Sequence, residues 1–218
     1  SEKLLLMNYL PMVYPKPIVK KKLSENDLQK KNIYSCPQTL FKLHPDFDQV
    51  IFEILEKDKK AVVYLIKDRN KIWYKKLIKR FSNNEKYNSK RIVFLDPLSQ
   101  EDYLLHLGRA SVLLDPIYYG AGNSFFESML FGTPSITLPS DHIKSRLVLG
   151  AYKQMEINDP PIAINIKDYI NLAVNYANRD DIGELKNRYK DAAEKKLFNT
   201  KKAGEEFNKI ILNLFNLN

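Results

Sequence analysis

Short apolar runs alternate with segments of helical periodicity through most of this 218-residue chain. A run such as AVVYLI (61–66) is continuously apolar and partly β-branched, which is typical of a strand buried on both faces. Strands are predicted at NIYSC (32–36), AVVYLI (61–66), RIVFL (91–95), SVLLD (111–115) and SITLP (135–139). Because helical segments separate these runs, the pattern predicts an α/β fold with a Rossmann-like, doubly wound parallel sheet.

The segments between the strands place apolar residues three and four positions apart, as amphipathic helices do. Helices are predicted within 44–58, 68–81, 99–110 with Ser99 as N-cap, 123–131, 140–152, 166–179, a segment after the DD pair at 180–181, and 201–215. We expect a crossover or linker over residues 1–31, the Rossmann-like domain over 32–195, and a C-terminal helical segment over 196–218 that packs back on the domain or on a preceding half of the protein.

The charge balance is basic, with 35 Lys and Arg against 26 Asp and Glu, a net charge of +9. Such a balance suits nucleic-acid binding, but the basic side chains are mostly Lys in small groups spread along the chain, and Arg is scarce. Solvated helix faces explain this pattern, so we expect no nucleic-acid partner. A nucleic-acid binder that uses these lysines stays an alternative.

The cysteine and histidine content limits which disulfides and metal sites the chain could form. The single cysteine, Cys36, excludes an internal disulfide and indicates a reducing, cytoplasmic setting. His44, His106 and His142 share no metal-ligand spacing, so no metal site is predicted. The run LLLM near the start is too short for a membrane span, and the apolar start without methionine suggests a piece of a longer protein.

The segment DPIYYGAGNSFFESMLFGTP (115–134) holds three of the seven glycines of the chain, Gly120, Gly122 and Gly132. It follows a predicted strand and leads into a predicted helix, which is where open parallel sheets bind ligands. Gly120 and Gly122 would let backbone N–H groups approach a ligand, and a helix that starts at Asn123 and Ser124 favours an anion such as phosphate.

An alternative interpretation of this segment needs no ligand. The spacing lacks the third glycine of a dinucleotide-binding loop, because residue 125 is Phe, and it lacks the Gly-Lys-Ser ending of a P-loop. Gly120 and Gly122 would then only turn the chain, while Ser124 and Glu127 form a capping box at the start of the helix.

Four segments, in order and spacing, cover most of the chain and carry a resemblance. They are YSCPQTLFKLHPDFD (34–48), RIVFLDPLSQEDYL (91–104), LLDPIYYGAGNSFFESMLFGTPSITLPSDHIKSR (113–146) and KLFNTKKAGEEF (196–207). Together they resemble the donor-binding half of glycosyltransferase family 41, which includes the O-linked N-acetylglucosamine transferases and their bacterial TPR-containing relatives. The resemblance implies the C-terminal half of a GT-B fold.

The resemblance also implies roles for residues in the first two segments. Lys42 matches the family lysine that contacts the donor pyrophosphate and is needed for activity, where an ammonium neutralises the leaving group. Gln38 and Thr39 flank the position of a polar side chain near the phosphates. Tyr103 matches an aromatic ring that stacks on uracil, although a tyrosine at the edge of the core is the alternative. The loop around Leu98 and Ser99 would offer backbone groups to the base.

In the third segment, Asn123 and Ser124 match the residues that hold the diphosphate at the start of the helix, beside Gly120 and Gly122. Glu127 matches the acidic residue that accepts hydrogen bonds from the ribose hydroxyls. Gly122 stands where the animal enzymes have a histidine, and Glu127 where they have an aspartate, which is similar to the bacterial branch.

The resemblance implies an inverting glycosyltransferase that transfers a sugar from a UDP-sugar to a hydroxyl acceptor on a protein or glycan. The donor it favours is UDP-N-acetylglucosamine. Lys42 would be its catalytic residue in this half, and neither cofactor nor metal would be required. The acceptor-side half with the catalytic base and the TPR repeats would precede this chain, so we expect these residues to bind nucleotide but to catalyse little alone. The alternative is a degenerate GT-B-like interaction module of a TPR protein.

Overall fold

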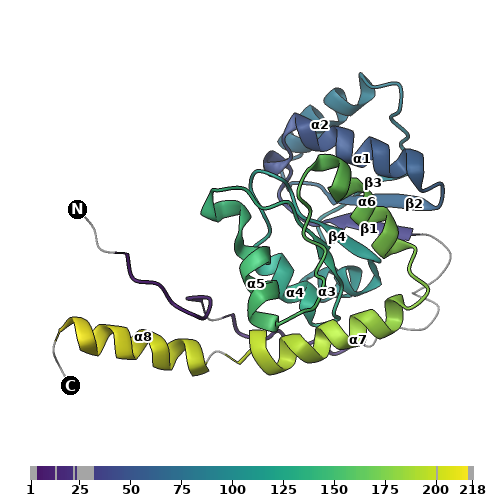
Figure 1. Cartoon of the computed structure of the whole chain (residues 1–218). Coiled ribbons are helices and arrows are strands. Elements are labelled where there is room, and N and C mark those ends of the chain that lie inside the picture. The colour runs from purple at the N-terminus through teal and green to yellow at the C-terminus, as the bar shows by residue number, and fades with distance from the viewer. Residues whose placement is uncertain (1–3, 13, 22, 24–31, 200, 216–218) are drawn as a thin grey trace.

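One sheet of five parallel strands organises the chain, in a computed structural model that describes residues 4–12, 14–21, 23, 32–199 and 201–215 (Figure 1). The strands are β1 (Asn32–Cys36), β2 (Ala61–Ile66), β3 (Ile92–Leu95), β4 (Val112–Leu114) and β5 (Ser135–Ile136). Their order in the sheet is β3-β2-β1-β4-β5, with every pairing parallel. The predicted Rossmann-like α/β architecture is therefore confirmed.

The last strand is shorter than the predicted run SITLP, because only Ser135 and Ile136 pair with β4. The next residue, Thr137, turns its backbone to another partner: its N–H donates to Pro161 O at 3.1 Å, and its carbonyl accepts from Ala163 N at 2.8 Å. The edge of the sheet is thus covered by the segment before the sixth helix, which leaves little exposed strand edge here.

Helices α1 (Pro45–Lys57) and α6 (Ile166–Ala177) lie together over one face of the sheet (Figure 1). Phe47 of α1 and Tyr169 of α6 meet edge to face with ring centroids 6.1 Å apart, and both are fully buried. Tyr34 and Cys36 of β1 belong to the same buried cluster. Alternate residues of β1 therefore face this helix pair, as the period of a strand requires.

Helix α3 (Gln100–Arg109) packs on the opposite face. Ser35 of β1 and His106 of α3 form a buried hydrogen bond of 2.8 Å between Oγ and Nε2. Leu107 of α3 packs with Leu113 of β4 in a second, smaller apolar cluster. The predicted N-cap is confirmed, since Ser99 Oγ accepts from Asp102 N at 3.2 Å.

The other helices fill the connections. They are η2 (Leu40–Lys42), α2 (Ile72–Ser82), α4 (Asn123–Met129), η3 (Ile143–Ser145), α5 (Leu147–Met155), α7 (Ile182–Ala192), the π-helical turn η4 (Ala193–Leu197) and α8 (Lys201–Leu214). The single helix predicted over 140–152 is divided into η3 and α5. Ser140 and Ser145 bond each other and nearby backbone groups, which competes with regular helix there.

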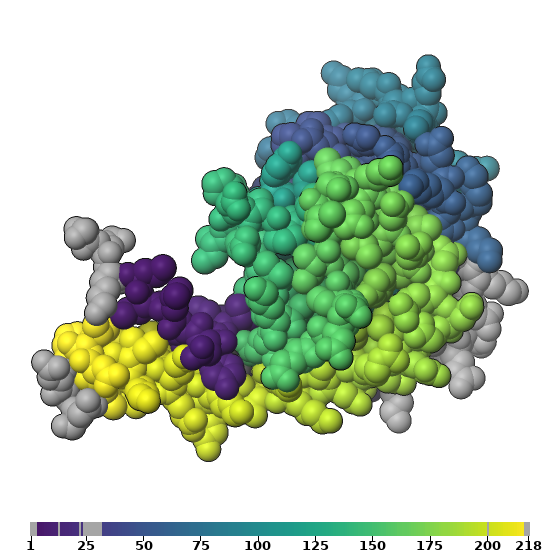
Figure 2. All heavy atoms as spheres, in the orientation of Figure 1, coloured from purple at the N-terminus to yellow at the C-terminus, as the bar shows by residue number. Residues whose placement is uncertain are grey.

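Helix α8 projects from the body of the molecule beside residues 4–12, and the two form an arm (Figures 1 and 2). Glu206 joins them, because its carboxylate accepts from the backbone N–H groups of Asn8 at 2.9 Å and of Tyr9 at 3.2 Å. Just before α8, Ala193 and Leu197 of η4 still lie in the main core. The chain therefore leaves the core after η4, and the predicted division into three parts stays a prediction.

Candidate functional site

The candidate site lies at the carboxyl edge of the sheet, where the order of the strands reverses. The chain runs outward from β1 through β2 to β3, and then returns to the other side of β1 to form β4 and β5. In open parallel sheets, ligands bind in the crevice that forms at such a reversal. The loops that leave β1 and β4 meet here, and they carry most of the residues predicted from the sequence.

Lys42, at the end of η2, points its ammonium across this edge to the glycine loop, which is the connection between β4 and α4 (residues 115–122). Its Nζ donates to Gln38 Oε1 at 2.9 Å and to Gly120 O at 3.3 Å, and it lies 4.5 Å from the centroid of the Tyr119 ring. Burial lowers the pKa of Lys42, which the negative charge of Asp115 partly offsets. None of the described carboxylates forms an ion pair with this ammonium, so its charge is held by neutral oxygens and a ring.

Gln38 bridges the two loops from a buried position. Its Oε1 accepts from Lys42, and its Nε2 donates to the hydroxyl of Ser124 in the first turn of α4. The capping box proposed as an alternative for Ser124 and Glu127 is wrong, because the N-cap of α4 is Gly122, two residues before Ser124, and no side chain caps the helix there. Both side chains have partners outside the helix.

Asp115 holds the glycine loop in shape, a role that the sequence alone did not reveal. Its buried carboxylate accepts from Ala121 N at 2.5 Å through Oδ1 and from Thr137 Oγ1 at 2.6 Å through Oδ2. The Tyr169 hydroxyl donates to its backbone carbonyl at 3.0 Å. Burial raises the pKa of Asp115 from 3.8 to about 6, against the lowering effects of these bonds and of Lys42.

The three glycines of this segment serve different purposes. A Cβ on Gly120 would lie 3.2 Å from both carboxylate oxygens of Asp115, so the loop closes tightly there. A Cβ on Gly122 would come no closer than 3.9 Å to its nearest neighbour, which leaves the backbone open. Gly132 has φ +66°, and its Cβ would lie 1.8 Å from Lys186 O, so it serves the fold and not the site.

Glu127 lies on α4 with the Tyr14 hydroxyl against its carboxylate and Tyr103 nearby. Tyr14 OH donates to Oε1 at 2.8 Å. Burial raises the pKa of Tyr103, and the nearby charge of Glu127 raises it further. Tyr103 also packs against the cluster of Leu107 and Leu113, so it is at once a tyrosine at the edge of the core and a neighbour of the site.

A cavity of about 570 Å³ opens beside these residues. Its lining includes Gln38, Thr39, Leu98 and Tyr103, all predicted site residues, together with parts of the loops that follow β2 and β3. Ser99 borders this region, but its side chain is engaged as the cap of α3. The cavity is large enough for a small organic ligand and has both apolar and polar walls.

The structure thus brings together Gln38, Lys42, Gly120 and Ser124 around one point, and Tyr103 and Glu127 at a second. Asn123 is exposed at the start of α4, and Thr39 is exposed beside Gln38. Sequence reasoning missed Asp115 and Tyr14. A signal for Asp115 was present, since an acidic residue directly after a buried strand needs partners, whereas nothing local marks Tyr14.

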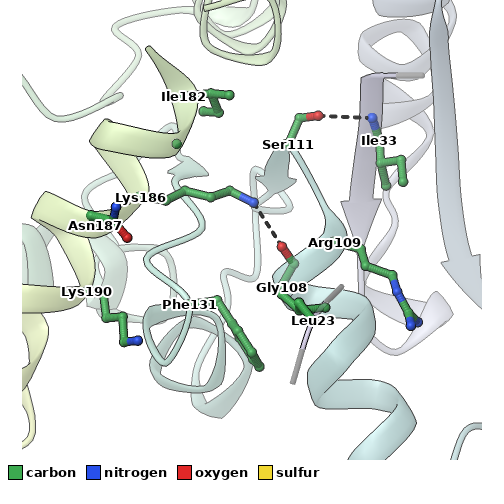
Figure 3. Close-up of a pocket in the computed structure, with 11 residues that line it drawn as sticks. Leu23, Ile33, Gly108, Arg109, Ser111, Phe131, Ile182, Lys186, Asn187 and Lys190 are labelled. Carbon is green, nitrogen blue, oxygen red and sulfur yellow. Dashed lines mark hydrogen bonds between the residues drawn. The ribbon is translucent and has the colours of Figure 1, made fainter. Parts of the chain in front are cut away.

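A second cavity, of about 380 Å³, lies at the opposite edge of the sheet, between α3 and α7 (Figure 3). Lys186 of α7 crosses beside it and donates from Nζ to Gly108 O at 2.9 Å and Ala110 O at 2.6 Å. These carbonyls belong to the end of α3, so the lysine caps that helix and ties it to α7. Burial lowers the pKa of Lys186 to about 8.

Among the described residues, no group of three or more His, Cys, Asp and Glu side chains could hold a metal ion. No helix among them is long and apolar enough to cross a membrane.

Comparison with known proteins gives one family. The sequence model of glycosyl transferase family 41 matches residues 14–207. No curated protein matches the chain at a significant level of sequence similarity.

Three solved structures illustrate the likeness of fold. A mutant of the Thermobaculum terrenum O-GlcNAc transferase superposes with a TM-score of 0.72 at 16% identity, over 93% of this chain and 37% of that chain. A mutant of S. aureus TarM in complex with fondaparinux, alpha-GlcNAc-glycerol and UDP has a TM-score of 0.64 at 16% identity, over 94% and 38%. Anabaena HepE in complex with UDP and glucose has a TM-score of 0.59 at 12% identity, over 88% and 53%. The chain spans less than two thirds of each neighbour.

Proposed function

Because this chain belongs to glycosyl transferase family 41, we propose that it binds a UDP-sugar at the carboxyl edge of its sheet. In this proposal it is the donor-binding half of a GT-B glycosyltransferase. The donor is UDP-N-acetylglucosamine, and the sugar passes to a hydroxyl acceptor with inversion.

The convergence of Lys42 with the glycine loop carries the proposal. A diphosphate leaving group gains negative charge as the glycosidic bond breaks, and a preorganised ammonium stabilises that charge. Lys42 is held at this point by Gln38 and Gly120 and has no carboxylate partner among the described residues. The α4 helix has only seven residues, so we assign the larger share of charge stabilisation to the ammonium. We assign the backbone N–H groups near Gly122 and Asn123 a positioning role.

The second group of residues suits the nucleoside. Glu127 offers carboxylate oxygens as acceptors for ribose hydroxyls, and Tyr103 and Leu98 line the cavity in which we place the uracil. Two of the structural neighbours, TarM and HepE, are described in complex with UDP, which supports this choice of nucleotide. We propose that no metal ion takes part, since Lys42 supplies the positive charge at the diphosphate.

The acceptor site and the catalytic base belong, in this proposal, to an N-terminal half that carries TPR repeats. The solved neighbours are longer than this chain, which covers 37% of the O-GlcNAc transferase and 38% of TarM. We therefore expect the 218 residues to bind UDP while transferring little sugar alone. Measurable transfer by the isolated chain would refute this part.

The first test is thermal unfolding of the chain with and without millimolar UDP, beside ADP and GDP. A ligand at about 100 times its dissociation constant adds roughly 2.7 kcal/mol. For a chain of this size each kcal/mol raises the midpoint by roughly 2–4 °C. We expect UDP alone to raise the midpoint by several degrees. No shift with any nucleotide would favour the degenerate interaction module.

The Lys42→Ala variant makes this test specific to the site. Loss of a hydrogen bond to a charged group costs roughly 1.5–3 kcal/mol, so the UDP-induced shift should largely disappear while the midpoint without ligand stays near that of the wild type. Lys60→Ala is the matched control, because it removes the same charge from an exposed position before β2. Equal loss in both variants would point to general charge attraction.

A further inference from the structure

Tyr14 comes to the candidate site from a segment far away in the sequence, 113 positions before Glu127. Its ring stacks on Phe126 with centroids 5.2 Å apart and an interplanar angle of 29°. Residues on either side of it are anchored too: Leu10 N donates to Gln154 Oε1 at 2.8 Å, and Lys16 forms an ion pair with Glu194. The position of the Tyr14 hydroxyl is therefore fixed by contacts on both sides.

The Glu127 carboxylate is left with a limited number of free acceptor positions. An ionised carboxylate offers roughly four lone-pair sites. Tyr14 OH occupies one at 2.8 Å. The remaining sites suffice for the two hydroxyls that a ribose presents at its 2′ and 3′ positions.

The two tyrosines remain donors over the whole neutral range. Burial, with the nearby charge of Glu127, raises the pKa of Tyr14 and of Tyr103 above the ordinary value for a phenol. An ionised carboxylate has no hydrogen to donate, so in the bond between Tyr14 and Glu127 the phenol is the donor. The Tyr14 hydroxyl thus fixes the rotation of the carboxyl group.

We propose that Tyr14 is a positioning residue, which orients the Glu127 carboxylate so that its free oxygen lone pairs receive the two ribose hydroxyls of the nucleotide. This inference rests on the proposed function. It gives the segment before β1 a part in nucleotide recognition. None of the contacts given above joins the described residues of that segment to the glycine loop itself.

The test measures Kd values of UDP and of 2′,3′-dideoxyuridine diphosphate by calorimetry, for the 218-residue chain and for Tyr14→Phe. The variant keeps the ring on Phe126 and removes only the hydroxyl. We expect UDP to bind about tenfold more weakly, which is about 1.4 kcal/mol. The dideoxy nucleotide should bind both chains alike, because it has no hydroxyls for Glu127 to receive.

Two further variants complete the design. In a Glu127→Ala background, Tyr14→Phe should cause no additional loss of UDP affinity, since the group that it orients is gone. Tyr176→Phe is the matched control, because this hydroxyl donates to Asp159 O at 2.8 Å, outside the site. It should leave both Kd values unchanged.

The outcomes separate the inference from the function on which it rests. Unchanged UDP affinity in Tyr14→Phe would overturn the inference while the nucleotide site stands. Equal weakening for UDP and its dideoxy analogue would also overturn it, because Tyr14 would then act through packing alone. Failure of the wild-type chain to bind UDP would overturn the proposed function, and the inference with it.

Discussion

Asp115 shows how a single buried residue sets the geometry of the site. Its two carboxylate oxygens bind Ala121 N and Thr137 Oγ1, so one side chain joins the glycine loop to the segment after β5. A carboxylate without solvent is costly unless it is fully hydrogen-bonded. Burial therefore raises the pKa of Asp115 to about 6, and the hydrogen bonds to the loop and the charge of Lys42 offset this rise only in part.

We predict that Asp115 makes the chain less stable as pH rises. Its pKa is about 6 in the folded chain and 3.8 as an ordinary carboxyl, so between these values the folded state holds a proton that the unfolded state has lost. The free energy of unfolding of the wild type, relative to Asp115→Asn, should therefore fall by about 2 kcal/mol between pH 4 and 7. Urea unfolding of both chains across this range measures the difference.

The wild type must be compared with Asp115→Asn because the titration of His106 changes the stability of the chain in the opposite direction. Burial, with a contribution from Arg109, lowers the pKa of His106 from 6.5 to about 4, so its contribution to stability grows with rising pH in the same window. That contribution is present in both chains and cancels in the difference. A difference that stays constant from pH 4 to 7 would show that Asp115 ionises as it does in the unfolded chain.

At the scale of elements, helix α4 has a glycine with a close neighbour on each side of it, Gly120 before the helix and Gly132 after it. Gly120 packs on the Asp115 carboxylate at the site, whereas Gly132 sits against α7 on the other side of α4. Of these two glycines, Gly132 is the one with a left-handed backbone, at φ +66°. The helix α4 therefore lies between one glycine that shapes the loop and another that lets α7 approach.

We predict that Gly132→Ala destabilises the chain by at least about 3 kcal/mol. A left-handed conformation costs an L-residue roughly 1–2 kcal/mol. In addition, the new Cβ would lie 1.8 Å from Lys186 O, so the backbone of α7 must move. Chemical unfolding measures the loss. Gly183→Ala is the matched control, because its Cβ would meet nothing within 4 Å and its helical position favours alanine by up to roughly 0.5–1 kcal/mol. Similar stabilities for the two variants would contradict this account.

At the scale of the whole molecule, the body differs from the arm, formed by α8 and residues 4–12, in how many side chains are buried (Figure 2). The body has one large core that joins both sides of the sheet. In α8, Ala203 is the only one of the residues Lys201–Leu214 that is buried, and Phe207 and Leu214 are 56% and 51% exposed. The stability of the body should therefore depend little on α8.

We predict that deleting residues 200–218 leaves the body folded and changes its unfolding midpoint by less than about 4 °C, the value of roughly 1 kcal/mol at this size. Differential scanning calorimetry of the two chains checks this. Leu197→Ala provides the contrast, because Leu197 is 2% exposed in the core just before the cut, and its truncation should cost roughly 2–5 kcal/mol. Loss of cooperative unfolding in the shortened chain would mean that α8 belongs to the folded unit.

The sequence predicted the elements well because their signals are local. AVVYLI forms β2 over its full length, and the α3 helix begins at its predicted cap, Ser99. Prediction was weaker where side chains compete with regular structure. The pair Ser140 and Ser145 divides a helix predicted as one, because their hydroxyls offer the backbone other partners.

What the sequence by itself determined is the alternation of strands and helices, and with it a parallel sheet whose carboxyl edge holds Lys42 and the glycine loop. Only the tertiary structure decided which distant groups meet there: Gln38 with Ser124, Asp115 with Thr137, and Tyr14 with Glu127. The physical reason is that periodicity and capping depend on neighbours a few residues away. The partner of a buried polar group depends instead on which segments the packing of the whole chain brings together.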